Sequence, residues 1–316
     1  MRRSGWDGDT SGVPRDRPRE WPRESPRESP RGSRRHPATR PAFPLAVREA
    51  APDGPDESDG AVVGFAHRGG ASHPELTGLE NTLVAFEHAA ALGYDYLETD
   101  VHATRDGVLV AFHDPQLDRV TDRQGRISRL TLEQVAEARI GGREPVPTLA
   151  QVVEALPGAL LNIDLKSSGA VAALAGFLAE RSLEHRVLVG SFSHLRLARF
   201  RRLTGGRVAT GASPVEVALF WILPSGRLAD LVTGRRIAAL QIPRRWGPVP
   251  VATRGLVRRA HAAGIPVHVW TVDDPVQMRV LLDRGVDGLM TDRTDILKDV
   301  LAEHGRGRPP RRRTHR

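Results

Sequence analysis

Short runs of β-branched and aliphatic residues alternate with longer amphipathic stretches from about residue 62 to residue 300. Each run is bounded by turn residues and has the composition of a buried strand. The runs are Val62–Ala66, Tyr96–Val101, Val108–Phe112, Leu160–Leu165, Val187–Ser191, Arg207–Thr210, Ala238–Ile242, Val267–Thr271 and Gly288–Thr291. This alternation over about 240 residues predicts a (β/α)8 barrel of the TIM type, with a doubly wound open sheet as the alternative.

Helix start signals lie between most of these runs. Thr82, Thr131, Thr148 and Asp274 each precede an apolar stretch of helical period, and Gln134 and Gln151 complete capping sequences. Several stretches end at a glycine, the residue best suited to a helix C-terminus. The sequence therefore predicts helices as the connections between parallel strands.

One connection is too short for a parallel crossover. Only six residues separate Val101 from Val108, and they contain Asp106-Gly107, which is typical of a tight antiparallel turn. We therefore expect a hairpin that distorts the barrel early in the chain. If Asp106 and Gly107 are the two central turn residues, His113 lies opposite Asp100, whereas a loop longer by one residue would place it opposite Thr99.

Charge is divided unevenly along the chain of 316 residues. Of the formal net charge of +8, residues 1–48 carry +6 (12 Arg, 6 acids) and residues 305–316 carry +6, which leaves −4 for the remainder. We predict disordered, basic tails at 1–59 and 305–316, because the first is rich in Pro and charge and nearly free of aliphatic residues, and a folded barrel domain at 60–304. Solvated tails are the favoured interpretation, and weak contact with an anionic membrane or nucleic acid is the alternative.

Composition excludes several classes of protein. The chain has no Cys, so it is not a disulfide scaffold or a cysteine-dependent enzyme. No apolar stretch approaches the roughly 18 to 20 residues of a membrane-spanning helix. Because the first residues do not resemble a secretory signal, we expect a cytoplasmic protein. Nothing in the sequence implies an obligate protein partner.

Ionisable residues concentrate where four of the predicted strands end. In a barrel these ends share one rim, where active sites are built. Glu98, Asp100 and Asp164 would converge there, and three carboxylates at close quarters repel one another unless a cation lies among them. Ligands that are all oxygen favour Mg²⁺ or Ca²⁺ over zinc. We therefore expect a divalent cation at this rim.

Two histidines flank that acidic cluster. His67 and His113 each follow a predicted strand, and imidazoles suit paired acid and base chemistry because their pKa lies near neutrality. Arg68 could clamp an oxyanion through two hydrogen bonds, or it could be an ordinary surface arginine.

An ordered series of short motifs extends the picture beyond these groups. The series runs His67-Arg68-Gly69, Glu80-Asn81-Thr82, Glu98-x-Asp100, Asp106-Gly107, His113-Asp114, Asn162-x-Asp164-x-Lys166, Ser191-Phe192, Trp270-Thr271-Val272 and Asp287-Gly288-Leu289-Met290-Thr291-Asp292. It resembles the glycerophosphodiester phosphodiesterase family, in its compact bacterial form, over about residues 62–300. The resemblance implies a distorted (β/α)8 barrel that hydrolyses glycerophosphodiesters to glycerol 3-phosphate and an alcohol with a divalent metal.

The resemblance also assigns roles to residues. It implies that Glu98, Asp100 and Asp164 hold Mg²⁺ or Ca²⁺ and that His67 and His113 are the catalytic pair. Phosphate binding falls to Arg68 and Lys166, and Glu80 stands at a family site position, although it could instead complement a helix dipole. Apart from the resemblance, Trp270 could line the substrate pocket or be an aromatic residue of the barrel core. The family usually has Glu where this chain has Asp164. The metal site is therefore where this chain departs most from the family pattern.

Two alternative functions stay open at this point. A lysophospholipase D or a phosphoinositide phospholipase-like enzyme on the same barrel would need an apolar approach for a lipid, which residues Val215–Leu223 would supply unless they form a buried barrel helix. A non-catalytic scaffold that presents its basic tails is the third hypothesis, and the intact set of charged groups argues against it.

Overall fold

The computed structural model of the chain describes residues 62–307. Its last helix ends at Gly307, three residues beyond the predicted domain boundary at 304. The predictions for residues 1–59 and 308–316 lie outside the described residues.

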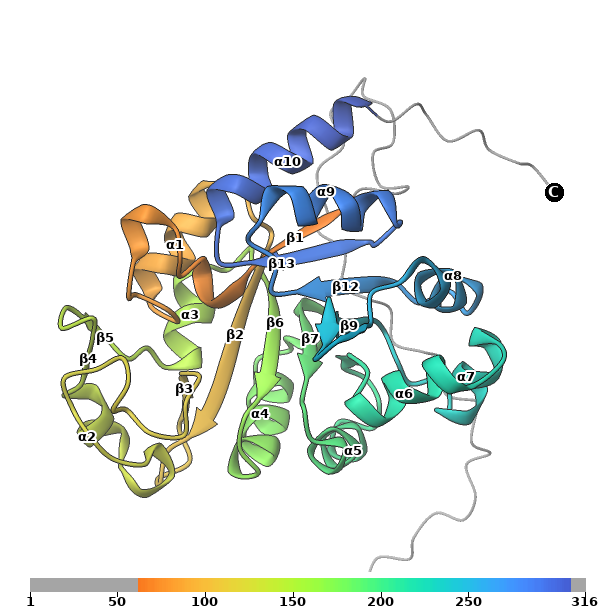
Figure 1. The fold of residues 1–316 in the computed structure, drawn as a ribbon. Helices are drawn as coiled ribbons and strands as arrows, with labels where there is room; N and C mark the ends of the chain where they lie inside the picture. The colour runs from red at the N-terminus through yellow and green to blue at the C-terminus, as the bar shows by residue number, and fades with distance from the viewer. Residues whose placement is uncertain (1–61, 308–316) are drawn as a thin grey trace, which may run out of the picture. The chain divides into compact units, whose positions relative to one another are not determined.

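Eight parallel strands form a curled sheet in the order β8-β7-β6-β2-β1-β13-β12-β9 (Figure 1). They are β1 (Val63–Ala66), β2 (Tyr96–Ala103), β6 (Leu160–Leu165), β7 (Val187–Gly190), β8 (Ala209–Thr210), β9 (Leu240–Pro243), β12 (Val267–Trp270) and β13 (Gly288–Thr291). A parallel bridge between Gly211 and Ala239 joins the two outer strands of this order. The predicted TIM-type barrel is therefore confirmed, with each expected strand present.

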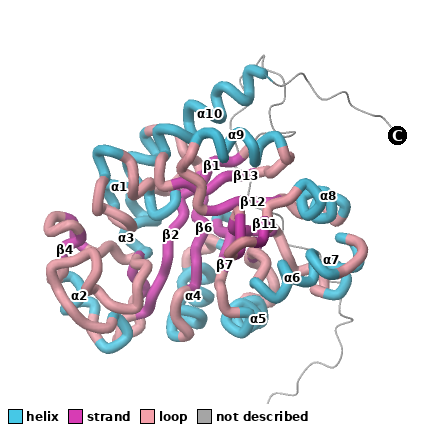
Figure 2. Tube along the Cα trace, viewed as in Figure 1, coloured by secondary structure: helices cyan, strands magenta, loops and turns pink. Residues whose placement is uncertain are grey.

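Helices surround the sheet and shield its outer face (Figure 2). They are α1 (Leu83–Ala91), α2 (Leu132–Ala136), α3 (Leu149–Ala155), α4 (Gly169–Glu180), α5 (His194–Leu203), α6 (Pro214–Ile222), α7 (Gly226–Val232), α8 (Arg254–Ala262), α9 (Pro275–Asp283) and α10 (Thr294–Gly307). The expected caps form at Thr82 and Asp274, and Thr131 and Thr148 each make a complete capping box. Within the described residues, no helix is both long enough and apolar enough to cross a membrane.

Three short antiparallel strand pairs accompany the parallel strands of the barrel. β3 (Leu109–Ala111) pairs with β2, β4 (Arg139–Ile140) pairs with β5 (Glu144–Pro145), and β10 (Arg245–Trp246) pairs with β11 (Val249–Pro250). The β2–β3 hairpin is the predicted distortion of the barrel.

The predicted register of the β2–β3 hairpin is wrong by one residue. Val101 pairs with Ala111, and the Phe112 amide donates to the Asp100 carbonyl at 2.9 Å, so Phe112 and not His113 lies opposite Asp100. The turn contains three residues between Thr104 and Val108, because the Thr104 amide donates to the Val108 carbonyl at 2.9 Å. Gly107 closes this turn with a φ of +84°, which glycine adopts without strain.

The alternation of side chains along the strands sends polar residues into the barrel. On β2, Leu97 and Val101 join the apolar layer beneath the helices, and on β6 Ile163 and Leu165 do the same. The intervening residues of both strands therefore point to the barrel axis. Phe65, Tyr96, Leu160 and Met290 form a separate buried cluster, which gives the polar residues a packed base.

Candidate active site

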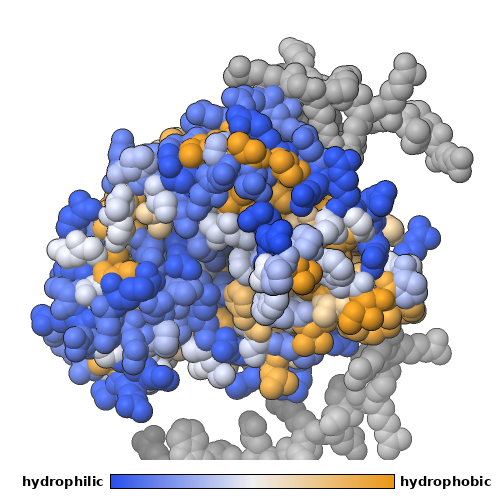
Figure 3. Space-filling view, in the orientation of Figure 1, coloured by the Kyte–Doolittle hydropathy of each residue, from blue (hydrophilic) through white to orange (hydrophobic). Residues whose placement is uncertain are grey.

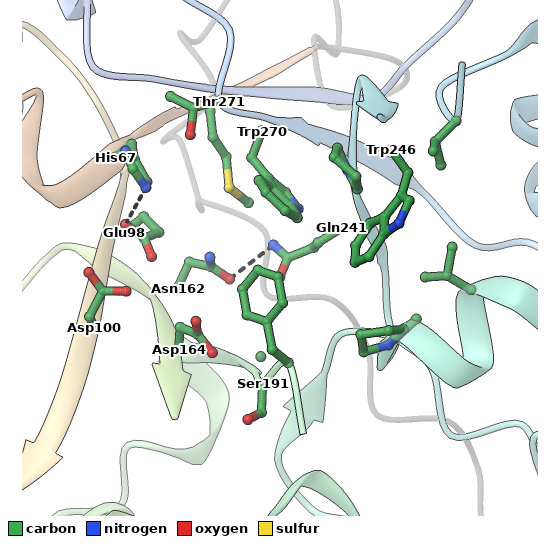
Figure 4. Close-up of a pocket in the computed structure, with 18 of the residues that line it drawn as sticks. His67, Glu98, Asp100, Asn162, Asp164, Ser191, Gln241, Trp246, Trp270 and Thr271 are labelled. Atoms are coloured by element: carbon green, nitrogen blue, oxygen red, sulfur yellow. Dashed lines mark hydrogen bonds and ion pairs between the residues drawn. The ribbon is translucent and has the colours of Figure 1, made fainter. Parts of the chain in front are cut away.

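A pocket of about 630 Å³ contains most of the predicted site residues (Figure 4). One wall is polar and the other is largely apolar: Figure 4 shows Glu98, Asp100 and Asp164 on one side and Trp246 and Trp270 on the other. The polar wall comprises His67, Arg68, Glu98, Asp100, His113, Asn162, Asp164 and Lys166. The apolar wall includes Phe192, Val217, Trp221, Ile222, Trp246, Val249, Trp270 and Met290. Among the predicted site residues, Glu80 is the exception, because it lies outside the pocket lining.

Asp100 is at the centre of the charged groups on the polar wall. Lys166 Nζ lies 2.9 Å from Asp100 Oδ1 and 2.7 Å from Asp164 Oδ2, and Arg68 Nε lies 3.2 Å from Asp100 Oδ2. Burial alone would raise the pKa of Asp100, but the charges of Lys166 and Arg68 outweigh it and lower that pKa. Asp100 is therefore a buried carboxylate that stays ionised.

Glu98 behaves differently although it lies two residues away. Its Oε2 accepts a hydrogen bond from the Arg68 amide at 3.0 Å and lies 3.9 Å from His67 Nε2. Burial, followed by repulsion from Asp100, raises the pKa of Glu98 to about 7. A cation near this carboxylate would lower its pKa again.

The acidic residues on the polar wall suit a divalent cation. Asp164 Oδ1 is buried and accepts no hydrogen bond in the described part of the chain, and the raised pKa of Glu98 marks a second carboxylate short of positive charge. Both groups offer the hard oxygen ligands that Mg²⁺ and Ca²⁺ prefer. Lys166 already neutralises part of the charge, and its ammonium separates Asp100 from Asp164.

A second group of metal-ligating side chains lies outside the pocket lining. Among the described residues, His73, Glu75 and His88 offer ligand atoms that all lie within 4.8 Å of one another. His73 Nδ1 accepts a hydrogen bond from the Glu75 amide, and the two imidazole rings lie 4.4 Å apart between centroids. Two nitrogens and one oxygen could hold a divalent cation, with a donor set unlike the all-oxygen set that the sequence predicts.

The two histidines of the pocket have matching environments. His67 Nδ1 lies 2.8 Å from Asp292 Oδ1, and His113 Nδ1 lies 2.6 Å from Asp114 Oδ1. Because a carboxylate can only accept, each Nδ1 carries a proton, and Nε2 of each neutral ring is left as an acceptor. Burial alone would lower the pKa of His67, but Glu98 and Asp292 together raise it.

Glu80 forms an ion pair with Arg68 from outside the pocket lining. Glu80 Oε1 lies 3.3 Å from Arg68 Nη1, and the same carboxylate accepts two hydrogen bonds from Arg119 at 2.6 and 3.0 Å. Arg68 itself has a φ of +50°, and two glycines with positive φ follow it. This turn directs the Arg68 side chain over Asp100, so Glu80 acts on the pocket through Arg68.

Several contributors to the site were not among the residues predicted from the sequence. Asp292 and Asp114 orient the histidines, and Asn81 donates to Asp100 Oδ2 at 3.2 Å. Gln241 donates to Asn162 Oδ1 at 3.0 Å, as the dashed line in Figure 4 shows. The signal for Asp114 and Asp292 was present, because both stand in the ordered series of motifs, but their partners depend on the closed barrel.

The geometry agrees with the comparison with known proteins. Residues 67–296 match the glycerophosphoryl diester phosphodiesterase family. The chain belongs to this family. It is therefore a phosphoric diester hydrolase, which argues against the non-catalytic scaffold hypothesis.

Three relatives illustrate the range of this family. The chain is 42% identical to the probable glycerophosphodiester phosphodiesterase 2 of Mycobacterium tuberculosis over 249 residues, which cover 78% of this chain and 93% of the relative. It is 26% identical to the lysophospholipase D GDPD1 of Homo sapiens, covering 75% and 85% of the two chains. An Oleispira antarctica phosphodiesterase in complex with the product sn-glycerol-3-phosphate is 25% identical, with a TM-score of 0.63 and coverage of 76% and 96%.

Proposed function

We propose that the chain hydrolyses glycerophosphodiesters to glycerol 3-phosphate and an alcohol, with His67 and His113 as the acid–base pair. The observation that carries this proposal is that both imidazoles line one pocket and each has its Nδ1 bound to an aspartate. Two imidazoles that are each oriented by an aspartate suit a reaction in which one proton is removed and another is supplied.

Charge neutralisation comes from the polar wall. A phosphodiester is an anion that resists nucleophiles, so its oxygens need positive partners. Arg68 and Lys166 supply two cationic side chains in the pocket, and Glu80 positions Arg68. Glu98, Asp100 and Asp164 would hold Mg²⁺ or Ca²⁺, which when bound would supply further positive charge to the phosphate.

The two histidines then divide the proton transfers. One Nε2 takes the proton from the nucleophile while a P–O bond forms. The nucleophile is either water, which gives glycerol 3-phosphate directly, or the glycerol 2-hydroxyl of the substrate, which gives a cyclic phosphate that water then opens to glycerol 3-phosphate. The other imidazole, protonated, donates its proton to the leaving alkoxide as the scissile P–O bond breaks. Asp292 and Asp114 stabilise the imidazolium form of their histidines in turn.

A second candidate substrate is a lysophospholipid, cleaved as by a lysophospholipase D. The apolar wall favours it, because Trp221, Trp246 and Ile222 offer an alkyl chain a continuous hydrophobic surface next to the polar wall. Trp270 lies between the two walls, where Phe192 packs edge-on against it at 5.4 Å between ring centroids.

An assay of two substrates tests both candidates. Purified full-length protein is incubated with glycerophosphocholine or lysophosphatidylcholine, with and without EDTA, and choline release is measured against a His67→Ala control. Release from glycerophosphocholine that needs both His67 and metal supports the first candidate. Release from lysophosphatidylcholine alone would replace the first by the second, and no release from either would overturn both.

A further inference from the structure

Exposed apolar side chains gather in one sector of the barrel. Of the 14 large hydrophobic residues exposed in the described part of the chain, 11 lie between residues 185 and 260, the sector from β7 to α8. Figure 3 shows hydrophobic surface over α6 and α7. Such a concentration differs from the single scattered apolar residues of an ordinary protein surface.

Five of these residues border the mouth of the pocket. Phe192, Trp221, Ile222, Trp246 and Val249 all line the pocket and are between 38% and 78% exposed. The apolar surface continues from the end of α6 into α7, where Leu231 and Val232 are 59% and 57% exposed. Neither residue lines the pocket, so their exposure does not serve substrate contact.

The same sector is strongly basic. Residues 185–260 contain 14 arginines and two acidic residues, Glu216 and Asp230. Both acidic residues are buried, and Glu216 pairs with the buried Arg201. The surface of the sector therefore presents exposed arginines, such as Arg244 and Arg245 beside Trp246, without an exposed carboxylate. By contrast, residues 62–184 carry 10 basic and 17 acidic residues.

We propose that this basic sector docks on an anionic lipid surface, with the pocket mouth facing the lipid. Tryptophan and aliphatic side chains insert at the interface between headgroups and acyl chains, while arginines bind the anionic headgroups around them. The charge of the sector complements a lipid surface of opposite sign. A second copy of this chain would present the same positive charge, so self-association through this sector would bring arginines against arginines. The proposal concerns docking and holds independently of the proposed reaction.

Binding of the full-length protein to vesicles tests the charge contribution. Partition is measured by flotation with vesicles of equal parts phosphatidylglycerol and phosphatidylcholine, and with phosphatidylcholine alone. Each basic residue near an anionic surface contributes roughly fivefold to partition, so Arg244→Gln with Arg245→Gln should lower it about 25-fold. Arg126→Gln with Arg129→Gln, an equal loss of charge at exposed sites outside the sector, should change it less than threefold. Equal effects of the two pairs, or no effect of either, would overturn the proposal.

A second pair of variants tests the apolar contribution. Leu231→Ser with Val232→Ser should lower partition at least fivefold, whereas Val276→Ser with Val280→Ser on α9 should not. Light scattering on the same samples detects self-association. A dimer that the Leu231 and Val232 substitutions dissociate would overturn the proposal in favour of an interface between copies. Turnover of soluble glycerophosphocholine by these variants should match wild type, so failure of the proposed reaction and failure of docking give different results.

Discussion

His67 Nδ1 lies 2.8 Å from Asp292 Oδ1, although 225 residues separate them in the chain. The contact forms where β1 and β13 pair in parallel, with Ala66 beside Thr291. His113 meets its own aspartate within the chain, since Asp114 is the next residue. The two halves of the proposed acid–base pair are thus oriented by the same chemistry, one through barrel closure and one through a local turn.

Asp292 should act as a positioning residue for His67. We predict that Asp292→Ala lowers kcat for a soluble glycerophosphodiester by about 10- to 100-fold, because the imidazole loses the partner that fixes its tautomer. Asp292→Asn should not restore the rate, since an amide can donate to Nδ1 and favour the other tautomer. The matched control is Asp295→Ala, three residues further along the chain from Asp292, which breaks an ion pair with Arg293 and should change kcat less than twofold. Rates for both Asp292 variants within threefold of wild type would contradict this role.

His113 and His102 should differ in their effect on the rate. His113 lines the pocket, whereas His102 does not and its Nε2 donates to the His113 carbonyl at 3.1 Å. We predict that His67→Ala and His113→Ala each lose about 10²- to 10⁴-fold in kcat with metal binding retained. His102→Ala should lose less than tenfold, because β2 and β3 also hold the backbone near His113. The measurement is kcat at saturating metal. Equal losses for His102→Ala and His113→Ala would show that the assignment of the second proton transfer to His113 is wrong.

Metal dependence should trace to the pocket and not to the group of His73, Glu75 and His88. We predict that EDTA abolishes hydrolysis, that Mg²⁺ or Ca²⁺ restores it, and that Zn²⁺ restores it poorly, because the pocket offers oxygen ligands. Asp164→Asn should weaken the activating metal at least tenfold in titrations, while His88→Gln should leave the activation curve unchanged. Full activity in excess EDTA would contradict a metal in the pocket. If His88→Gln alone shifted the metal activation curve, the activating metal would be assigned to the group of His73, Glu75 and His88.

Local patterns predicted the fold well, and contacts between distant residues were harder to predict. The alternation of Tyr96–Val101 and the capping sequences at Thr131 and Thr148 depend on neighbouring residues, so the strand and both helices appear as expected. The hairpin register failed because Asp106-Gly107 fits turns of two or three residues equally. Thr104 favours the three-residue turn, because its hydroxyl donates to Asp106 Oδ1 and accepts a hydrogen bond from the Val108 amide.

The site residues show the same division. The periodicity of β2 and β6 predicted that Glu98, Asp100 and Asp164 share one rim, and all three line the pocket. Pattern alone did not show that Lys166 would lie between two of these carboxylates, or that Glu80 would contact Arg119 as well as Arg68. These contacts depend on side-chain lengths and on loops whose paths are set by packing.

The buried His268 should make stability depend on pH. It lies inside the barrel against Phe65 at 4.8 Å between ring centroids, and burial lowers its pKa from 6.5 to about 3. The unfolded chain therefore binds a proton at mildly acidic pH that the folded protein excludes, so the stabilisation is complete above pH 6.5 and is lost as pH falls from there toward 3. Between pH 7.5 and pH 5 this loss is about 2 kcal/mol.

We predict that His268→Leu, although less stable at neutral pH, reduces the difference in unfolding free energy between these two pH values by that amount. His185→Leu, at an exposed site, should not reduce it. Urea unfolding of the three proteins at both pH values measures it, and an unchanged difference in His268→Leu would show that the His268 imidazole is protonated in the folded barrel.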